Sequence, residues 1–117
     1  MKLRRASAVL FGILVASTTT AAPPDEHLGT VSFPVSCSAS VQSDFNRGVA
    51  LLHDFWYEEA RPQFERILKA DPSCAMAHWG VAMGGFHQIW DIPDAAGMAA
   101  GWREMQAAHA LPSRSER

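Results

Sequence analysis

The chain has 117 residues, of which 48% are hydrophobic, and its formal net charge is −2 at pH 7. This length allows at most one small domain, and the apolar content is sufficient for a folded core. The charge balance argues against nucleic acid as a partner, because a protein that binds it needs a strongly basic surface.

The first 21 residues have the layout of a secretory signal peptide. A basic start over 1–5 precedes an apolar run over 6–16 and a stretch of small residues over 17–22. The apolar run is too short for an ordinary membrane span. We therefore expect cleavage after Ala21, with an uncleaved N-terminal anchor as the alternative. Cleavage removes three positive charges, which changes the formal charge from −2 to −5 and leaves a mildly acidic, exported protein, periplasmic or secreted, without membrane contact.

Residues 22–38 are rich in Pro, Ser, Thr and Gly, which predicts an extended leader. Its apolar side chains at alternate positions, Val31, Phe33 and Val35, are expected to pack onto the helices, because a short strand would lack a partner. A serine at position 38, 40 or 43 is expected to cap the first helix.

Two amphipathic helices are predicted at about 39–53 and 56–70. Their apolar residues recur three or four positions apart and so share one face of each helix: Phe45, Val49, Leu52 and Trp56, then Ala60, Phe64 and Ile67. The turn falls at 53–55, and helices joined so closely pack antiparallel. Pro62 lies beyond the favoured first position of the second helix, which predicts a late start or a kink.

Two more helices are predicted after Pro72. The third carries Ala75, Trp79, Ala82, Phe86 and Trp90 at helical spacing; the fourth, which ends near residue 110, carries Ala95, Met98, Trp102, Met105 and His109. Gly84 and Gly85 weaken the third helix by about 1 kcal/mol each relative to alanine, which close approach of another backbone would explain. Residues 112–117 are predicted to form a polar tail.

The stretch from Val41 to Cys74 resembles a tetratricopeptide (TPR) repeat. That 34-residue unit has Gly at position 8, Ala at 20, Phe at 24 and Pro at 32, and with Val41 as position 1 these residues are Gly48, Ala60, Phe64 and Pro72. Three other positions of the pattern differ and hold Asp44, Leu51 and Ile67. In such a repeat the small residues let the two helices approach closely, and the phenylalanine fills the gap beside them.

The resemblance implies an all-α fold of stacked antiparallel helical hairpins with about four helices. The TPR-like domain would span 39–111, with one repeat at 41–74 and a degenerate second repeat, one A-type and one B-type helix, at 75–111. Residues 28–117 also resemble the start of larger exported bacterial TPR-containing proteins of poorly defined function. Because helical repeats bury their apolar faces on neighbouring repeats, we expect either an N-terminal piece of such a protein or a chain that self-associates.

The exported part of the chain contains two cysteines, and an even number in an oxidising compartment suggests one disulfide. The repeat model places Cys37 just before the first A-type helix and Cys74 at the start of the next. Adjacent A-type helices begin side by side, so a Cys37–Cys74 bridge is expected, with two buried thiols as the alternative.

Nothing in the sequence predicts an enzyme or a cofactor. The carboxylate pairs are adjacent in sequence and point apart, and there is no nucleophile elbow or glycine-rich phosphate loop. His53, His78 and His87 are candidate metal ligands, but the last two would lie about two and a half turns apart on one helix. We therefore expect no metal site. The alternative, a small periplasmic metal- or haem-binding helical protein, depends on these three histidines.

Large aromatic residues are numerous for four short helices, and most are expected in the core: Phe55, Trp56, Tyr57, Trp79, Phe86, Trp90 and Trp102. The resemblance implies a groove lined by A-type helices, in which the candidate partner-binding residues are Phe55, His78, Trp79 and Trp90. The expected function is a non-catalytic interaction or assembly scaffold that binds a protein or peptide. A fragment of a longer TPR protein without independent function is a further alternative.

Overall fold

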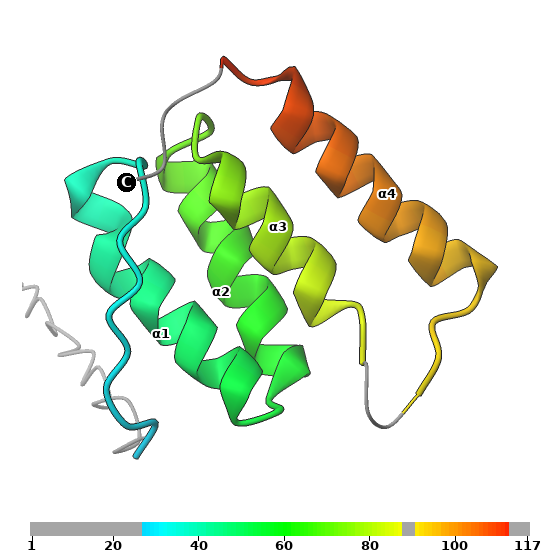
Figure 1. Ribbon diagram of the computed structural model, residues 1–117, viewed down its shortest axis with the longest axis horizontal. Helices are drawn as coiled ribbons and strands as arrows, with labels where there is room; N and C mark the ends of the chain where they lie inside the picture. The colour runs from blue at the N-terminus through cyan, green and yellow to red at the C-terminus, as the bar shows by residue number, and fades with distance from the viewer. Residues whose placement is uncertain (1–26, 88–90, 113–117) are drawn as a thin grey trace, which may run out of the picture.

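The computed structural model describes residues 27–87 and 91–112. Within these ranges the secondary structure is entirely helical: η1 Ala39–Val41, α1 Gln42–His53, α2 Tyr57–Ala70, α3 Ala75–Gly84 and α4 Ala95–Ala110 (Figure 1). The predicted all-α fold of antiparallel helical hairpins is confirmed. The predicted signal peptide at 1–21 and most of the predicted polar tail lie outside the described residues.

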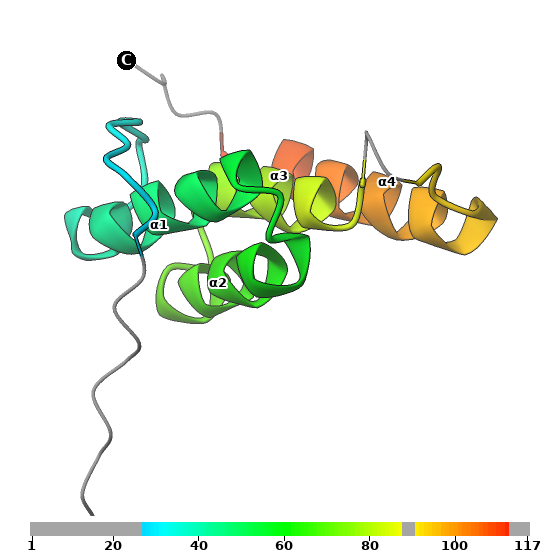
Figure 2. The ribbon, with the colours of Figure 1, turned by 90° about the horizontal axis from the view of Figure 1, so that it is seen from below.

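The helices form one layer with a single helix beneath it. Helices α1, α3 and α4 lie side by side, and α2 packs on one face of this layer, against α1 and α3 (Figure 2). The leader, residues 27–38, crosses α1 on the face opposite α2. The sequence predicted that α4 would be the B-type helix of a second repeat, and such a helix would lie beside α2. Helix α4 instead lies beside α3 and continues the layer of α1 and α3.

The core lies between α1, α2 and α3 and is organised around Phe64. This side chain is fully buried, together with those of Phe45, Leu51 and Ile67. A Cβ atom on Gly48 would lie 2.7 Å from Phe64 Cζ, and one on Gly80 would lie 2.2 Å from Phe64 Cδ1. The ring therefore occupies the space that two glycines leave free, one on α1 and one on α3. The close approach expected at Gly48 is confirmed, and the sequence pattern did not single out Gly80.

One buried polar side chain links α1 to α2. Gln63 is 3% exposed, and its Nε2 donates to the carbonyl oxygen of Asp44 at 3.1 Å. Its Oε1 accepts hydrogen bonds from Arg47, at 2.7 Å, and from Arg66. Because each polar atom of the Gln63 amide is hydrogen-bonded, its burial leaves no unsatisfied group between the two helices.

The turn between α1 and α2 places Phe55 in the left-handed region of backbone conformation, with φ at 61°. The backbone N–H of Trp56 donates to the carbonyl of Leu51 at 2.9 Å, and that of Phe55 donates to the carbonyl of Leu52 at 3.2 Å. These two bonds define a Schellman motif, in which the left-handed residue is usually glycine. The predicted turn is confirmed, and it contains a strained non-glycine residue.

This strain predicts that Phe55→Gly is more stable than Phe55→Ala by about 1 kcal/mol, because only glycine adopts the conformation without a clash of Cβ. Both substitutions remove the ring and its contact with Tyr57, at a centroid distance of 6.3 Å. The difference between the two variants therefore isolates the backbone effect. Urea unfolding measures it, and equal stabilities would contradict the strained conformation.

Helix α3 ends at Gly84, earlier than the hydrophobic pattern predicted. A Cβ atom on Gly84 would lie 2.8 Å from Arg61 Cβ and 3.1 Å from Arg61 Cα, so α2 approaches α3 closely at this point. The close approach expected for the glycine pair is thus confirmed at Gly84. The two adjacent glycines also favour termination. Phe86 and His87 follow the helix rather than lie on it, which corrects the prediction, and Trp90 lies outside the described residues.

Two predictions about helix starts were wrong. No serine side chain caps η1 or α1, whose N-cap residues are Ser38 and Val41; the hydroxyl of Ser38 pairs instead with that of Ser40 at 2.9 Å. Helix α2 begins at Tyr57, so Pro62 lies inside it and the predicted late start was wrong; a kink at Pro62, the other outcome considered, stays a prediction.

Candidate interaction surfaces

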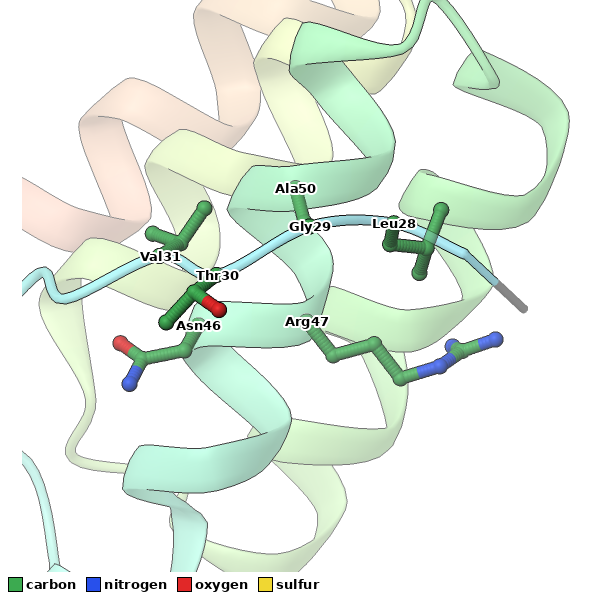
Figure 3. A pocket seen from close by; sticks show the side chains of 7 residues that line it. All are labelled: Leu28, Gly29, Thr30, Val31, Asn46, Arg47 and Ala50. Atoms are coloured by element: carbon green, nitrogen blue, oxygen red, sulfur yellow. The ribbon is translucent and has the colours of Figure 1, made fainter. Parts of the chain in front are cut away.

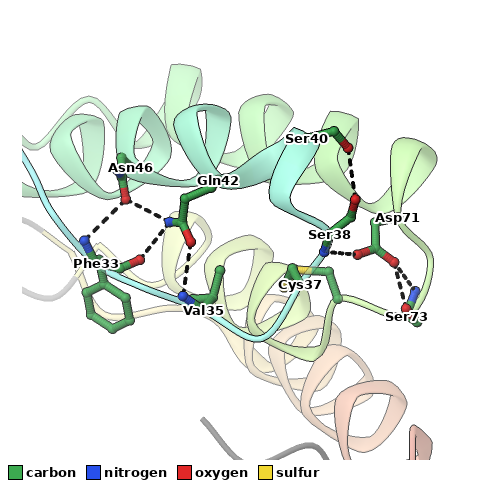
Figure 4. Close-up of a disulfide and its surroundings, with 10 residues drawn as sticks. Phe33, Val35, Cys37, Ser38, Ser40, Gln42, Asn46, Asp71 and Ser73 are labelled. Carbon is green, nitrogen blue, oxygen red and sulfur yellow. Dashed lines mark hydrogen bonds between the residues drawn. A yellow bond between two sulfur atoms is a disulfide. The ribbon is translucent and has the colours of Figure 1, made fainter. Parts of the chain in front are cut away.

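A disulfide joins Cys37 to Cys74, whose Cα atoms are 4.8 Å apart (Figure 4). Cys37 lies just before η1 and Cys74 is the N-cap residue of α3, as the repeat model predicted. The buried carboxylate of Asp71 adds a polar link, because its Oδ2 accepts from the backbone N–H of Ser38 at 2.7 Å. The end of the leader is therefore fixed to the turn between α2 and α3. The disulfide also suggests an oxidising, exported environment.

Side-chain amides of α1 bind the backbone of the leader (Figure 4). Gln42 Nε2 donates to the carbonyl oxygen of Phe33 at 2.8 Å, and Gln42 Oε1 accepts from the N–H of Val35 at 3.1 Å. Asn46 Oδ1 accepts from the N–H of Phe33 at 3.2 Å and from Gln42 Nε2 at 3.0 Å. Because Gln42 and Asn46 are one helical turn apart, they form a continuous pair along the extended chain.

The apolar side chains of the leader face the helices. Val31 and Val35 pack against the buried core. The ring of Phe33 stacks on Trp79 of α3, at a centroid distance of 6.3 Å and an interplanar angle of 18°, and contacts Phe45 at 5.7 Å. The prediction that these three alternate side chains pack onto the helices is confirmed. The contact is partial, since Phe33 remains 40% exposed.

An open pocket of about 350 Å³ lies between the leader and α1 (Figure 3). Residues 28–31 form one wall, and Asn46, Arg47 and Ala50 of α1 form the other. Leu28 and Val31 still pack against the core at the edge of this pocket, whereas Gly29 and Thr30 between them are exposed.

A second surface lies between α3 and α4. It is a groove of about 290 Å³ that only apolar residues and glycines line, and its large side chains are Trp79, Met83, Phe86, Met98, Trp102 and Met105. Trp102 is 65% exposed and Met98 is 54% exposed. Helix α4 has no buried residue. The apolar stripe of α4 therefore lines an open groove rather than a closed core.

Two polar contacts involve α4: one caps its first turn and the other joins it to α3. Asp94 caps the helix, because its Oδ1 accepts from the N–H of Gly97 at 2.7 Å. His78 Nδ1 of α3 lies 2.7 Å from Glu104 Oε2 of α4, within hydrogen-bonding distance. This second contact joins the two helices that form the groove.

The four predicted partner-binding residues are not brought to one site. Phe55 and Trp79 both line an open pocket of about 250 Å³ near the turn between α1 and α2. His78 instead contacts Glu104, and Trp90 lies outside the described residues. Of the predicted set, Trp79 has the most central position, because it lines this pocket and the α3–α4 groove and also stacks on the leader.

The expectation that most large aromatic side chains are in the core was wrong. Among those the structure describes, Tyr57 is buried and Trp79 is partly buried, whereas the exposed ones are Phe55, Trp56, Phe86 and Trp102. Helical spacing identified the stripe on α4, but it does not reveal whether another element covers that stripe. The exposure of Trp102 and Met98 was therefore not predictable from the pattern.

The three histidines considered as metal ligands lie in different surroundings. His53 is exposed at the end of α1, His78 contacts Glu104, and His87 stacks on Tyr57 at a centroid distance of 4.9 Å. Within residues 27–87 and 91–112, no three His, Cys, Asp or Glu side chains are grouped so that they could hold a metal ion. The structure thus gives these histidines no common site.

Comparison of the chain with protein-family models, with curated proteins and with solved structures found no match. None of the described helices is both long and apolar enough to span a membrane. The functional interpretation therefore depends on the two surfaces themselves.

Proposed function

We propose that the protein is an exported, TPR-like helical scaffold, periplasmic or secreted, that binds another protein and carries out no covalent chemistry. The observation that carries this proposal is the open apolar groove between α3 and α4. Large exposed apolar patches on folded proteins mark interaction surfaces, because leaving them in water is unfavourable. The packing of Phe64 against Gly48 in an antiparallel hairpin supports the repeat assignment. The position of α4 differs from that of the B-type helix in a second repeat, because α4 lies beside α3 and not beside α2.

The chemistry of the groove fits an apolar protein partner. Trp102 and Trp79 provide large rings, and tryptophan is among the residues that contribute most to binding energy at interfaces. Met98 and Met105 are flexible side chains that adapt to the shape of a partner. Because no charged residue lines the groove, a partner would insert apolar side chains there, with polar contacts confined to its edges.

Site-specific photo-crosslinking tests this function. A benzophenone amino acid at position 102 is expected to give one dominant crosslinked protein when the chain is exported by its own cells. Lys69 is the matched control, because it is exposed on α2, outside the groove. The same probe at position 69 should not give that product.

Mass spectrometry of the product identifies the partner, and a crosslink to a second copy of this chain would indicate the self-associating form of the scaffold. The same weak products from positions 69 and 102 would contradict the proposal.

A further inference from the structure

We propose that residues 31–35 of the leader occupy a peptide-binding surface on α1 and α3. An extended segment of another protein binds this surface when the leader moves away. The expected segment is uncharged and carries apolar side chains at alternate positions. This proposal goes beyond the scaffold function assigned to the α3–α4 groove. It defines a second binding surface, formed by α1 and the side of α3 that faces α1, and it specifies the chemistry of the segment that binds there.

The polar contacts of this surface recognise backbone, not sequence. Gln42 and Asn46 bind the N–H and C=O groups of Phe33 and the N–H of Val35, and every extended segment without proline at those positions offers the same groups. The two bonded residues are two apart, which is the repeat of an extended chain. The amide pair therefore accepts an extended backbone irrespective of its side chains, as the edge of a β-sheet does.

The apolar contacts define the preferred side chains. Val31 and Val35 pack on the core, and the ring of Phe33 contacts the rings of both Phe45 and Trp79. Residues 28–36 carry no charge. A segment with the same alternation would fill the same positions, whereas a charged side chain there would lose hydration without a compensating partner.

The leader can leave this surface without loss of the covalent anchor. Cys37 lies beyond the contact segment, so the bond to Cys74 stays intact when residues 28–35 move away. The leader is also only partly buried: Phe33 is 40% exposed, and an open pocket lies between the backbone of residues 28–31 and α1, although Leu28 and Val31 reach the core. Segments with few buried contacts open most readily in a folded protein.

A peptide added in trans tests the proposal. In the full chain, Val31, Phe33 and Val35 are all replaced by serine, so that the leader no longer competes. The probe is a synthetic peptide with the sequence of residues 27–36, and the indole NMR resonance of Trp79 reports its binding. We expect this peptide to bind the variant at least about tenfold more tightly than it binds the unaltered chain, because the unaltered leader occupies the surface.

Two controls make the test specific. The same peptide with serine at the three apolar positions should not bind. Adding Gln42→Ala and Asn46→Ala to the variant should weaken binding of the unaltered peptide about tenfold, because the hydrogen bonds to its backbone are lost.

Absence of binding to a variant that keeps its helicity and its disulfide would overturn the proposal, as would equal binding to the unaltered chain. Should the triple variant fail to fold, Phe33→Ser alone takes its place with the same readout. The crosslinking test at Trp102 concerns the other surface, so either proposal can fail while the other stands.

Discussion

Replacement of both Cys37 and Cys74 by alanine is expected to lower the free energy of unfolding by about 3–4 kcal/mol. The bond joins residues 37 positions apart and so restricts the unfolded chain much more than the folded one. Alanine avoids placing a hydroxyl at the fully buried position 74. For so small a domain this loss is a large part of the total stability. Urea unfolding followed by far-UV circular dichroism measures it.

Reductant provides the control for this prediction. It should destabilise the unaltered chain to a similar degree and leave the double alanine variant unchanged. A variant that is as stable as the unaltered chain would contradict a stabilising role for the bond.

The second large effect is expected at Gly80. A methyl group there would lie 2.2–2.5 Å from atoms Cδ1, Cγ and Cδ2 of Phe64. These atoms are at the base of the ring, which cannot turn away while α2 and α3 keep their spacing. Although alanine favours helix, Gly80→Ala is therefore expected to lower the free energy of unfolding by about 2–3 kcal/mol through overpacking.

Gly101 of α4 is the matched control, since a Cβ atom there would have no heavy atom within 4 Å. Gly101→Ala should leave stability unchanged or raise it by up to about 1 kcal/mol, because the higher helix propensity of alanine is then unopposed. The same thermal or urea unfolding experiment measures both variants. Similar effects of the two substitutions would show that Gly80 does not set the spacing of α2 and α3.

The part of the fold that the sequence predicted correctly depends on local signals. Helices α1 and α2 have strong hydrophobic periodicity, a short connection, and Asp71 followed by Pro72 at the end, and each of these acts within a few residues. The disulfide followed from the repeat model, because that model specifies which helix starts are neighbours. Gly48 and Phe64 were identified for the same reason.

The remaining features depend on how distant elements meet, which periodicity does not contain. Glycine is required at position 80 because the base of the Phe64 ring packs against the α3 backbone there. The spacing of apolar residues along the chain does not predict this contact. The stripe of Met98 and Trp102 has the same spacing whether a neighbour covers it or not. The place of α4 in the layer depends on the connection between α3 and α4, which no local pattern determines. The amide pair Gln42 and Asn46 was missed because polar residues on a helix are usually solvated.

The disulfide also determines which parts of the protein would carry mechanical load. Because it joins the end of the leader to the start of α3, it closes the whole α1–α2 hairpin into a covalent ring. Tension applied between the two ends of the chain would pass from Cys37 directly to Cys74 and on through α3 and α4. The hairpin that contains Phe64 would lie outside the line of force. The chain would thus extend at α4 first under tension and keep its core hairpin folded.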